Sequence, residues 1–299
     1  MSSGSKHTVL SVIVLSAAVT FTITVWRLPR GPVHIVVPQV PDRPGVPPDP
    51  YTLRVCADPN NLPFSNERGE GFENRIANLV AAELGRRVQY YWQPQRRGFI
   101  RTTLAAGECD VVVGVPSTFE LARVTRPYYR SSFMFVSRHA RRLGIRSLDD
   151  RRLRTLRIGI QITGEDYGNP PPAQALAMRH ITDNVYGYTV YGDYSAAHPS
   201  WGVLDAVTRG DVDVAIAWGP LAGYVASQAK AALDVVPVPP GETTPALPLS
   251  FDISMGVRRD DAALASALNR ALMRRAREIQ DILTSFGVPV LTPREEVRG

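Results

Sequence analysis

Apolar and polar positions change period repeatedly along the chain. LRVCA at 53–57 is a short apolar run of strand formers, and the segment 58–71 is rich in turn formers. From Phe72 the apolar positions recur at helical spacing, and Gly85 stands where a helix C-cap belongs. Because ligands collect beyond the carboxyl ends of strands in open α/β sheets, we expect the loop 58–71 to line a cleft, the alternative being an ordinary surface loop.

Strand-like and helix-like stretches go on alternating after this opening, which is typical of a mainly parallel sheet flanked by helices. No sequence repeat is apparent beyond the alternation itself. Near the end, Asp260 or Asp261 should cap one long helix whose apolar stripe ends at Phe286 and Gly287. The expected strands include 88–92, 110–114, 133–138, 156–162, 188–191, 212–218 and 250–257, and the expected helices lie around 99–106, 172–180, 203–208 and 221–232.

The N-terminal segment 1–30 predicts export. Twenty residues, 7–26, contain no Asp, Glu, Lys or Arg, and as a helix rising about 1.5 Å per residue they would just span a bilayer core. Cleavage after Ala18 would make the segment a signal peptide, whereas an uncleaved run would make it a membrane anchor. The segment 31–50 holds seven prolines and is expected to be an extended linker.

Several short motifs occur in an order that carries a resemblance: CADPNNLPFSN, EGFENRIA, PQRRGF, AGECDVVVGVP and RPYYRSS. They resemble the type II periplasmic solute-binding proteins, and more narrowly the J proteins of bacterial methanol oxidation clusters (MxaJ and XoxJ type). The resemblance implies an α/β fold of two lobes joined by a hinge, each lobe a mainly parallel sheet with flanking helices. Lobe 1 would comprise 51–138 plus 246–299, and lobe 2 would comprise 139–245.

The charge pattern excludes a nucleic-acid-binding function. The chain has 34 basic and 28 acidic residues, and the basic ones are nearly all arginine. It contains no zinc-finger spacing, RNA-binding signature or basic helix with interleaved aromatics. The run 138–157 holds eight arginines, which form either a solvated face or a surface that steers the protein onto an acidic partner.

The two cysteines, Cys56 and Cys109, would be in an oxidising compartment after export, which permits a disulfide. If the strands that carry them are parallel neighbours in matched register, the cysteines are about three residues out of step. That offset is roughly 10 Å along the strand, beyond the ~7 Å limit for bridged Cα atoms. A bridge and a pair of free thiols both remain open, and two cysteines do not make a zinc site.

The cleft of such a fold should gather polar and aromatic side chains from both lobes. Amino-acid receptors of this superfamily grip the ligand carboxylate with an arginine, but Thr118 stands at that place, with Arg123 and Arg126 nearby. The aspartate that holds the ligand amine is replaced by Trp218. The candidate cleft residues are Asp58, Asn60, Asn61, Phe64, Glu73, Gln95, Arg96, Arg97, Gln161, Thr163, Gly164, Glu165 and Trp218.

The resemblance implies a binding or accessory protein that has no enzymatic activity and needs no cofactor. Its expected partners are a PQQ-dependent methanol or alcohol dehydrogenase and a c-type cytochrome, with a small polar ligand as a further candidate. Two alternatives stay open: a transporter receptor for a small polar solute, and a dehydratase-like enzyme that would use Glu165. Common catalytic motifs are absent from the sequence.

Overall fold

The computed structural model describes residues 49–162, 170–190, 194–239, 243 and 247–291. The chain divides into two units, Met1–Pro47 and Pro48–Gly299, and every described residue belongs to the second. The predicted export segment 1–30 and nearly all of the predicted linker 31–50 lie outside the described residues. In the part that is described, we find no helix long and apolar enough to cross a membrane.

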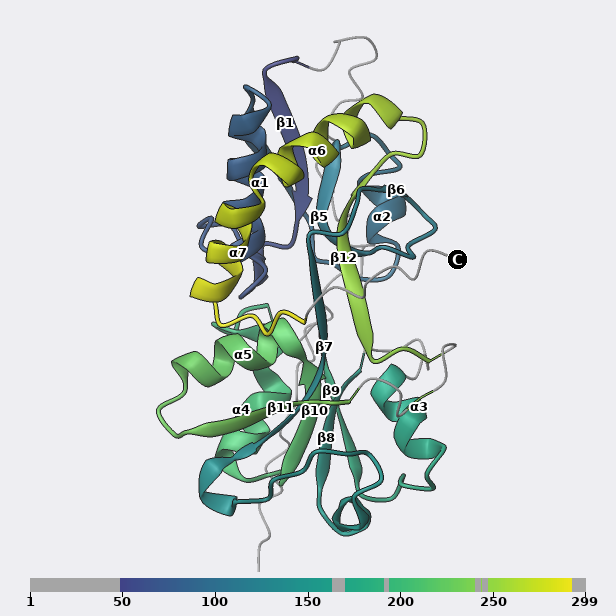
Figure 1. Ribbon diagram of the computed structural model, residues 1–299, viewed down its shortest axis with the longest axis vertical. Coiled ribbons are helices and arrows are strands. Elements are labelled where there is room, and N and C mark those ends of the chain that lie inside the picture. Colours follow the sequence, from purple (N-terminus) through teal and green to yellow (C-terminus); the bar gives the residue numbers. More distant parts are fainter. Residues whose placement is uncertain (1–48, 163–169, 191–193, 240–242, 244–246, 292–299) are drawn as a thin grey trace, which may run out of the picture. The chain divides into compact units, whose positions relative to one another are not determined.

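The predicted alternation of strands and helices is present in the structure (Figure 1). The strands are β1 (Thr52–Ala57), β2 (Asn60–Asn61), β3 (Ser65–Asn66), β4 (Arg87–Trp92), β5 (Val111–Pro116), β6 (Arg123–Val124), β7 (Tyr129–Arg138), β8 (Ile158–Ile162), β9 (Val185–Thr189), β10 (Val214–Trp218), β11 (Leu233–Pro237) and β12 (Ser250–Val257). The helices are α1 (Phe72–Glu83), α2 (Phe99–Thr102), α3 (Pro171–Ala177), α4 (Gly202–Arg209), α5 (Gly219–Gln228), α6 (Ala262–Arg274) and α7 (Ala276–Ser285), with short 3-10 turns η1 (His139–Arg141), η2 (Arg151–Arg154) and η3 (Pro199–Trp201).

Strand β7 is shared by two groups of strands (Figure 1). Its first part, up to Ser132, pairs antiparallel with β12, which continues through β5 and β1 to β4. Its second part, from Phe133, pairs with β10 and β11, and β10 continues through β8 to β9. We call the β4–β1–β5–β12 group with its helices the first lobe and the β10–β8–β9 group the second. The boundaries at 138 and 246 stay a prediction.

Each lobe has its own hydrophobic core. In the first, the apolar stripe of α1 packs with α6 and α7 against β1, β5 and β12, and Phe72 and Ile76 are fully buried. In the second, the β8–β10 sheet is covered on one face by α3 and on the other by α4 and α5. Both arrangements follow from strands that are apolar on both faces and helices that are apolar on one.

The structure reveals a repeat that the sequence analysis missed. In the first lobe Arg54 bonds through its backbone and guanidinium to Asp110 and through Nη1 to the Gly107 carbonyl. In the second lobe Arg157 makes the same set of bonds to Asp213 and to the carbonyl of Gly210. The sequence separations are 56 and 53 in both lobes. Each pair ties the start of the lobe's first strand to the start of the strand beside it.

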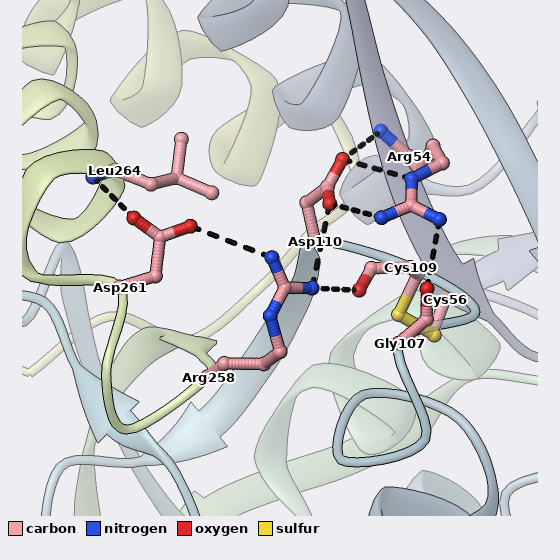
Figure 2. Close-up of polar contacts among 8 residues, drawn as sticks. All are labelled: Arg54, Cys56, Gly107, Cys109, Asp110, Arg258, Asp261 and Leu264. Atoms are coloured by element: carbon pink, nitrogen blue, oxygen red, sulfur yellow. Dashed lines mark hydrogen bonds and ion pairs between the residues drawn. A yellow bond between two sulfur atoms is a disulfide. The ribbon is translucent and has the colours of Figure 1, made fainter. Parts of the chain in front are cut away.

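The first lobe extends this pair into a larger network (Figure 2). Arg258, at the end of β12, contacts Asp110 Oδ1 at 3.4 Å and donates to the Cys109 carbonyl at 2.7 Å. Its other nitrogen pairs with Asp261, whose Oδ1 accepts a bond from Leu264 N and caps α6. One buried carboxylate thus joins β1, β5, β12 and the start of α6.

Cys56 and Cys109 are bridged in the structure, with Cα atoms 5.5 Å apart. The register assumed from the sequence is present, because Cys56 lies opposite Val112 in the parallel pair of β1 and β5. The inference of a 10 Å gap failed because β5 begins only at Val111. Cys109 lies outside the strand, so the spacing of a regular strand does not apply to it.

Two predicted helices are shorter than expected. The C-terminal helix is interrupted at Arg275, which separates α6 from α7 and pairs through its guanidinium with Glu83 of α1 and with Glu278. Helix α2 ends at Thr102 instead of near residue 106, because Thr103 leaves the helical conformation, with φ −121° and ψ −83°. The spacing of apolar residues predicts which face of a helix is buried, but it does not predict the residue at which the helix breaks or ends.

Replacing Asp110 should cost more than the equivalent change in the second lobe. We expect Asp110→Ala to lower the free energy of unfolding by about 3 kcal/mol, because two guanidinium groups lose their buried counter-ion. Asp213→Ala should cost about 1 kcal/mol, because Arg157 and Arg141 are 45% and 44% exposed and their charges are screened. Urea denaturation of both variants would measure the difference. Equal losses would contradict the reading of Asp110 as the centre of a larger network.

Candidate functional site

The loop after β1 is held in one conformation by the start of α1. Asn74 Oδ1 accepts hydrogen bonds from the backbone nitrogens of Gly71 and Asn66, both at 3.1 Å. Gly71 lies so close to the Phe64 carbonyl that a Cβ on it would overlap that oxygen. The sequence pattern FSN…GF therefore builds a tight loop that holds Phe64 and Glu73 beside each other at the carboxyl end of the sheet.

Asp58 connects three segments and is 1% exposed. Its carboxylate accepts bonds from Asn60 N at 2.9 Å, from Gln95 N at 2.8 Å and from the Tyr194 hydroxyl at 2.6 Å. Asn60 and Gln95 belong to the first lobe, whereas Tyr194 follows β9 of the second. Asp58 therefore acts as a junction between the two lobes.

Further contacts join the opening loop to residues 194–201 of the second lobe. Asn60 Nδ2 donates to the Ala196 carbonyl at 3.0 Å, and Trp201 Nε1 donates to the Leu62 carbonyl at 3.0 Å. The Arg96 guanidinium lies 5.3 Å from the centre of the Tyr194 ring. Asn60 and Arg96 therefore contact the second lobe, in a region that the sequence analysis did not single out.

The Tyr194 hydroxyl should contribute measurably to stability. We expect Tyr194→Phe to lower the free energy of unfolding by about 1–2 kcal/mol, because the Asp58 carboxylate loses a short charge-assisted bond. Tyr186→Phe is the matched control, since Tyr186 is 47% exposed on β9, and it should change the free energy by less than about 0.5 kcal/mol. Urea denaturation measures both. A Tyr194 variant as stable as its control would show that the bond between Tyr194 and Asp58 does not stabilise the fold.

A cavity of about 340 Å³ lies where the two groups of strands meet. Six predicted residues line it: Asn61, Phe64, Glu73, Gln95, Gln161 and Trp218. Arg97 does not line it, and Thr163, Gly164 and Glu165 lie outside the described residues. Whether these residues bind a ligand stays a prediction.

Much of the cavity wall comes from residues that sequence reasoning missed. Phe133 and Phe251 lie on β7 and β12, and their rings meet Trp218 edge-on at 5.4 and 5.9 Å between centroids. Their strands were predicted, but which side chains converge is decided by pairing between distant strands. The remaining wall residues are Gly114, Pro116, Tyr129, Pro170, Val190, Ser200, Leu221 and Ile253.

Glu73 is the acidic side chain among the described residues of the cavity wall. It is 8% exposed, and its carboxyl lies against Gly114, where a Cβ would overlap Oε1. Burial, together with the nearby charge of Asp58, raises the pKa of Glu73 to about 8. At neutral pH the empty cavity therefore presents mainly a neutral carboxylic acid.

The described wall of the cavity lacks the charged side chains with which an amino-acid receptor holds its ligand. Trp218 ends β10 where an aspartate would hold an amine, and neither Thr118 nor Arg123 lines the wall. Arg126 borders a separate hollow near Met273. Among the described wall residues there is no arginine, lysine or histidine, and the described residues include no cluster suited to a metal ion. A bound carboxylate would thus have no charged partner among these residues.

Comparison with known proteins gives consistent relatives. The family model of bacterial extracellular solute-binding proteins, family 3, matches residues 53–287. The chain is 32% identical to Protein MoxJ of Methylorubrum extorquens over 97% of both chains. It is 35% identical to the crystal structure of periplasmic binding protein XoxJ from Methylobacterium extorquens AM1, covering 81% of this chain and 100% of that one, with a TM-score of 0.66.

The fold is confirmed by these structures as the type II periplasmic binding protein fold. MxaJ from Methlophaga aminisulfidivorans MPT, at 24% identity, covers 80% of this chain and 100% of its own with a TM-score of 0.67, which supports the fold alone. The predicted resemblance is thereby confirmed. The chain belongs to the bacterial extracellular solute-binding proteins, family 3, and within that family it is similar to MoxJ and XoxJ.

Proposed function

We propose that this protein is a periplasmic accessory protein of a PQQ-dependent methanol or alcohol dehydrogenase system. In this role it binds a segment of the dehydrogenase in the cavity between the lobes and assists its maturation or activation. The cavity carries the proposal, because its wall is largely apolar and aromatic and its described residues offer no basic group for a free amino acid. The similarity to MoxJ and XoxJ along most of the chain supports the same role.

Export and partner cofactors are part of the proposal. The uncharged N-terminal run would direct the chain out of the cytoplasm, either as a cleaved signal peptide or as an anchor. The quinone would belong to the dehydrogenase and the haem to its c-type cytochrome, since this protein is proposed to act by binding alone.

The arginine-rich run 138–157 is proposed as the surface of first encounter. Arg142, Arg146, Arg151 and Arg154 are exposed, and none of them forms an ion pair with another described residue. Asp149 and Asp150 in the same run are already paired, with Arg179 and Arg152. A partner with an acidic surface would be attracted here, and salt would weaken the association.

The test is direct binding to the purified dehydrogenase. We expect a complex at low salt that Phe251→Arg weakens more than tenfold, because a guanidinium would occupy the cavity. Tyr186→Arg adds the same charge to the exposed face of β9 and should leave the affinity unchanged. Surface plasmon resonance with both variants measures this. Absence of a complex with the wild-type protein, or equal effects of the two changes, would refute the proposal.

A receptor for a small polar solute is the second candidate, favoured by the family to which the chain belongs. It predicts that one polar solute raises the melting temperature by several degrees through tight binding. A thermal-shift screen in which no polar solute stabilises the protein would count against it. The dehydratase alternative predicts turnover that Glu165→Gln abolishes.

A further inference from the structure

The cavity has one acidic group and no basic group among its described wall residues. Besides Glu73, its polar side chains are the neutral ones of Asn61, Gln95, Tyr129, Gln161 and Ser200. Among these residues an anionic ligand would find no opposite charge, whereas a cation would find one in ionised Glu73.

Glu73 lacks the bonds that other buried carboxylates of this protein have. Asp58 and Asp110 each accept several hydrogen bonds, but no donor to the Glu73 carboxyl is found in the described part of the chain. Among the titratable groups packed around it, Asp58 raises the pKa of Glu73, and Glu73 in turn raises the pKa of Tyr90, Tyr128 and Tyr129. All of these are acids or neutral phenols, so the described residues around Glu73 supply no counter-ion.

Aromatic rings form another part of the cavity wall. Phe133, Trp218 and Phe251 form a contiguous edge-to-face set, and Phe64 and Tyr129 also reach the cavity wall. The faces of such rings attract cations, and Trp does so most strongly. Apolar side chains such as Leu221 and Ile253 suit a hydrocarbon stem.

We infer that the cavity binds an organic cation on an apolar stem, such as a lysine side chain, with Glu73 as its counter-ion and the aromatic rings around its ammonium group. This inference rests on the proposed function, because both take this cavity as the binding site. It adds the chemical class of the group that the cavity binds. Glu73 gives up its proton when the cation enters, and this proton passes to the solvent. Binding therefore strengthens with rising pH until Glu73 is ionised in the empty protein.

The test uses the full chain with n-butylammonium and with Nα-acetyl-L-lysine methylamide. Isothermal titration calorimetry should show both binding, about tenfold more tightly at pH 7.5 than at pH 6.5, with close to one proton released. Butan-1-ol and butyrate, which share the stem but not the cation, should bind at least tenfold more weakly. Free L-lysine should bind more weakly than the methylamide, because its carboxylate has no basic partner among the described wall residues.

Two variants assign the effect to Glu73. Glu73→Gln should lose at least tenfold in affinity for both cations and should lose the pH dependence, whereas Glu83→Gln, on the same helix but paired with Arg274 and Arg275, should bind like wild type. Phe251→Leu should weaken cation binding severalfold and provides a second readout. Binding of butan-1-ol as tight as that of butylammonium, or unchanged binding to the Glu73 variant, would overturn the inference.

The two cations also separate possible sources of the ligand and separate this inference from the proposed function. Binding of both compounds supports a lysine side chain of a polypeptide, and binding of butylammonium alone supports a free amine. A dehydrogenase complex without any amine binding would overturn the inference and leave the proposed function standing. Amine binding without a dehydrogenase complex would do the reverse.

Discussion

A Cys56→Ser/Cys109→Ser double variant should lose about 4 kcal/mol of unfolding free energy. The bridge closes a loop with a sequence separation of 53 residues, and cross-linking a loop of this length removes about that much free energy from the unfolded chain. Both cysteines are also buried in an apolar cluster with Phe99 and Leu104, so the added hydroxyl groups increase the cost. Urea denaturation under oxidising conditions measures the loss.

The matched control for this variant is Cys56→Ala/Cys109→Ala, which removes the bridge without adding buried hydroxyl groups. It should lose less than the serine variant but still more than about 2 kcal/mol. A reducing agent should lower the stability of the wild-type protein and leave both variants unchanged. Variants within about 1 kcal/mol of wild type would show that the bridge does not stabilise the fold.

The elements of this fold are largely readable from the hydrophobic pattern. Strands β1, β5, β8 and β10 are short apolar runs, and α1 shows a clear helical stripe that starts at Phe72. Such periods follow from burial and need no knowledge of distant residues. The cap of α6 at Asp261 was also within reach, because a capping side chain acts within a single turn.

The contacts between elements were the part that the pattern could not supply. The sequence left the disulfide open because the spacing of apolar residues does not predict the turn before Asp110. The repeat is one Arg–Asp pair in each lobe, Arg54 with Asp110 and Arg157 with Asp213, and two residues 56 positions apart are too few to stand out as a sequence repeat. A comparison of the two strand starts, LRV and LRI, would have found it.

About half of the predicted cleft residues line the cavity in the structure. Glu73, Phe64 and Trp218 follow strands or open helices at the expected edge, so their convergence was inferred from topology. Phe133 and Phe251 lie inside long strands that pair across the middle of the protein, and their place in the wall depends on register. Asp58 was assigned to the cleft, but its bonds place it in the junction with Tyr194.

Glu73→Gln should make the protein more stable at pH 8 by at least about 3 kcal/mol. The unfolded chain releases the Glu73 proton near pH 4.5, whereas the folded protein holds it up to about pH 8. The contribution of the protonated carboxyl is therefore fully present below pH 4.5 and is lost as the pH rises toward 8. The loss is about 1.4 kcal/mol per pH unit, or about 5 kcal/mol over the interval. A neutral amide avoids it.

The difference in unfolding free energy between Glu73→Gln and wild type, measured in urea at each pH from 5 to 8, isolates this one group. It should grow steadily with pH, and parallel profiles would contradict the assignment. Glu83→Gln is the control with the opposite sign, because hydrogen bonds from Arg274 and Arg275 hold the pKa of Glu83 below its usual value. Its carboxylate stabilises the fold above that range, so the Glu83 variant should be the less stable protein at neutral pH. The pKa values of two glutamates on one helix are thus shifted in opposite directions, because one faces the cavity and the other faces two arginines.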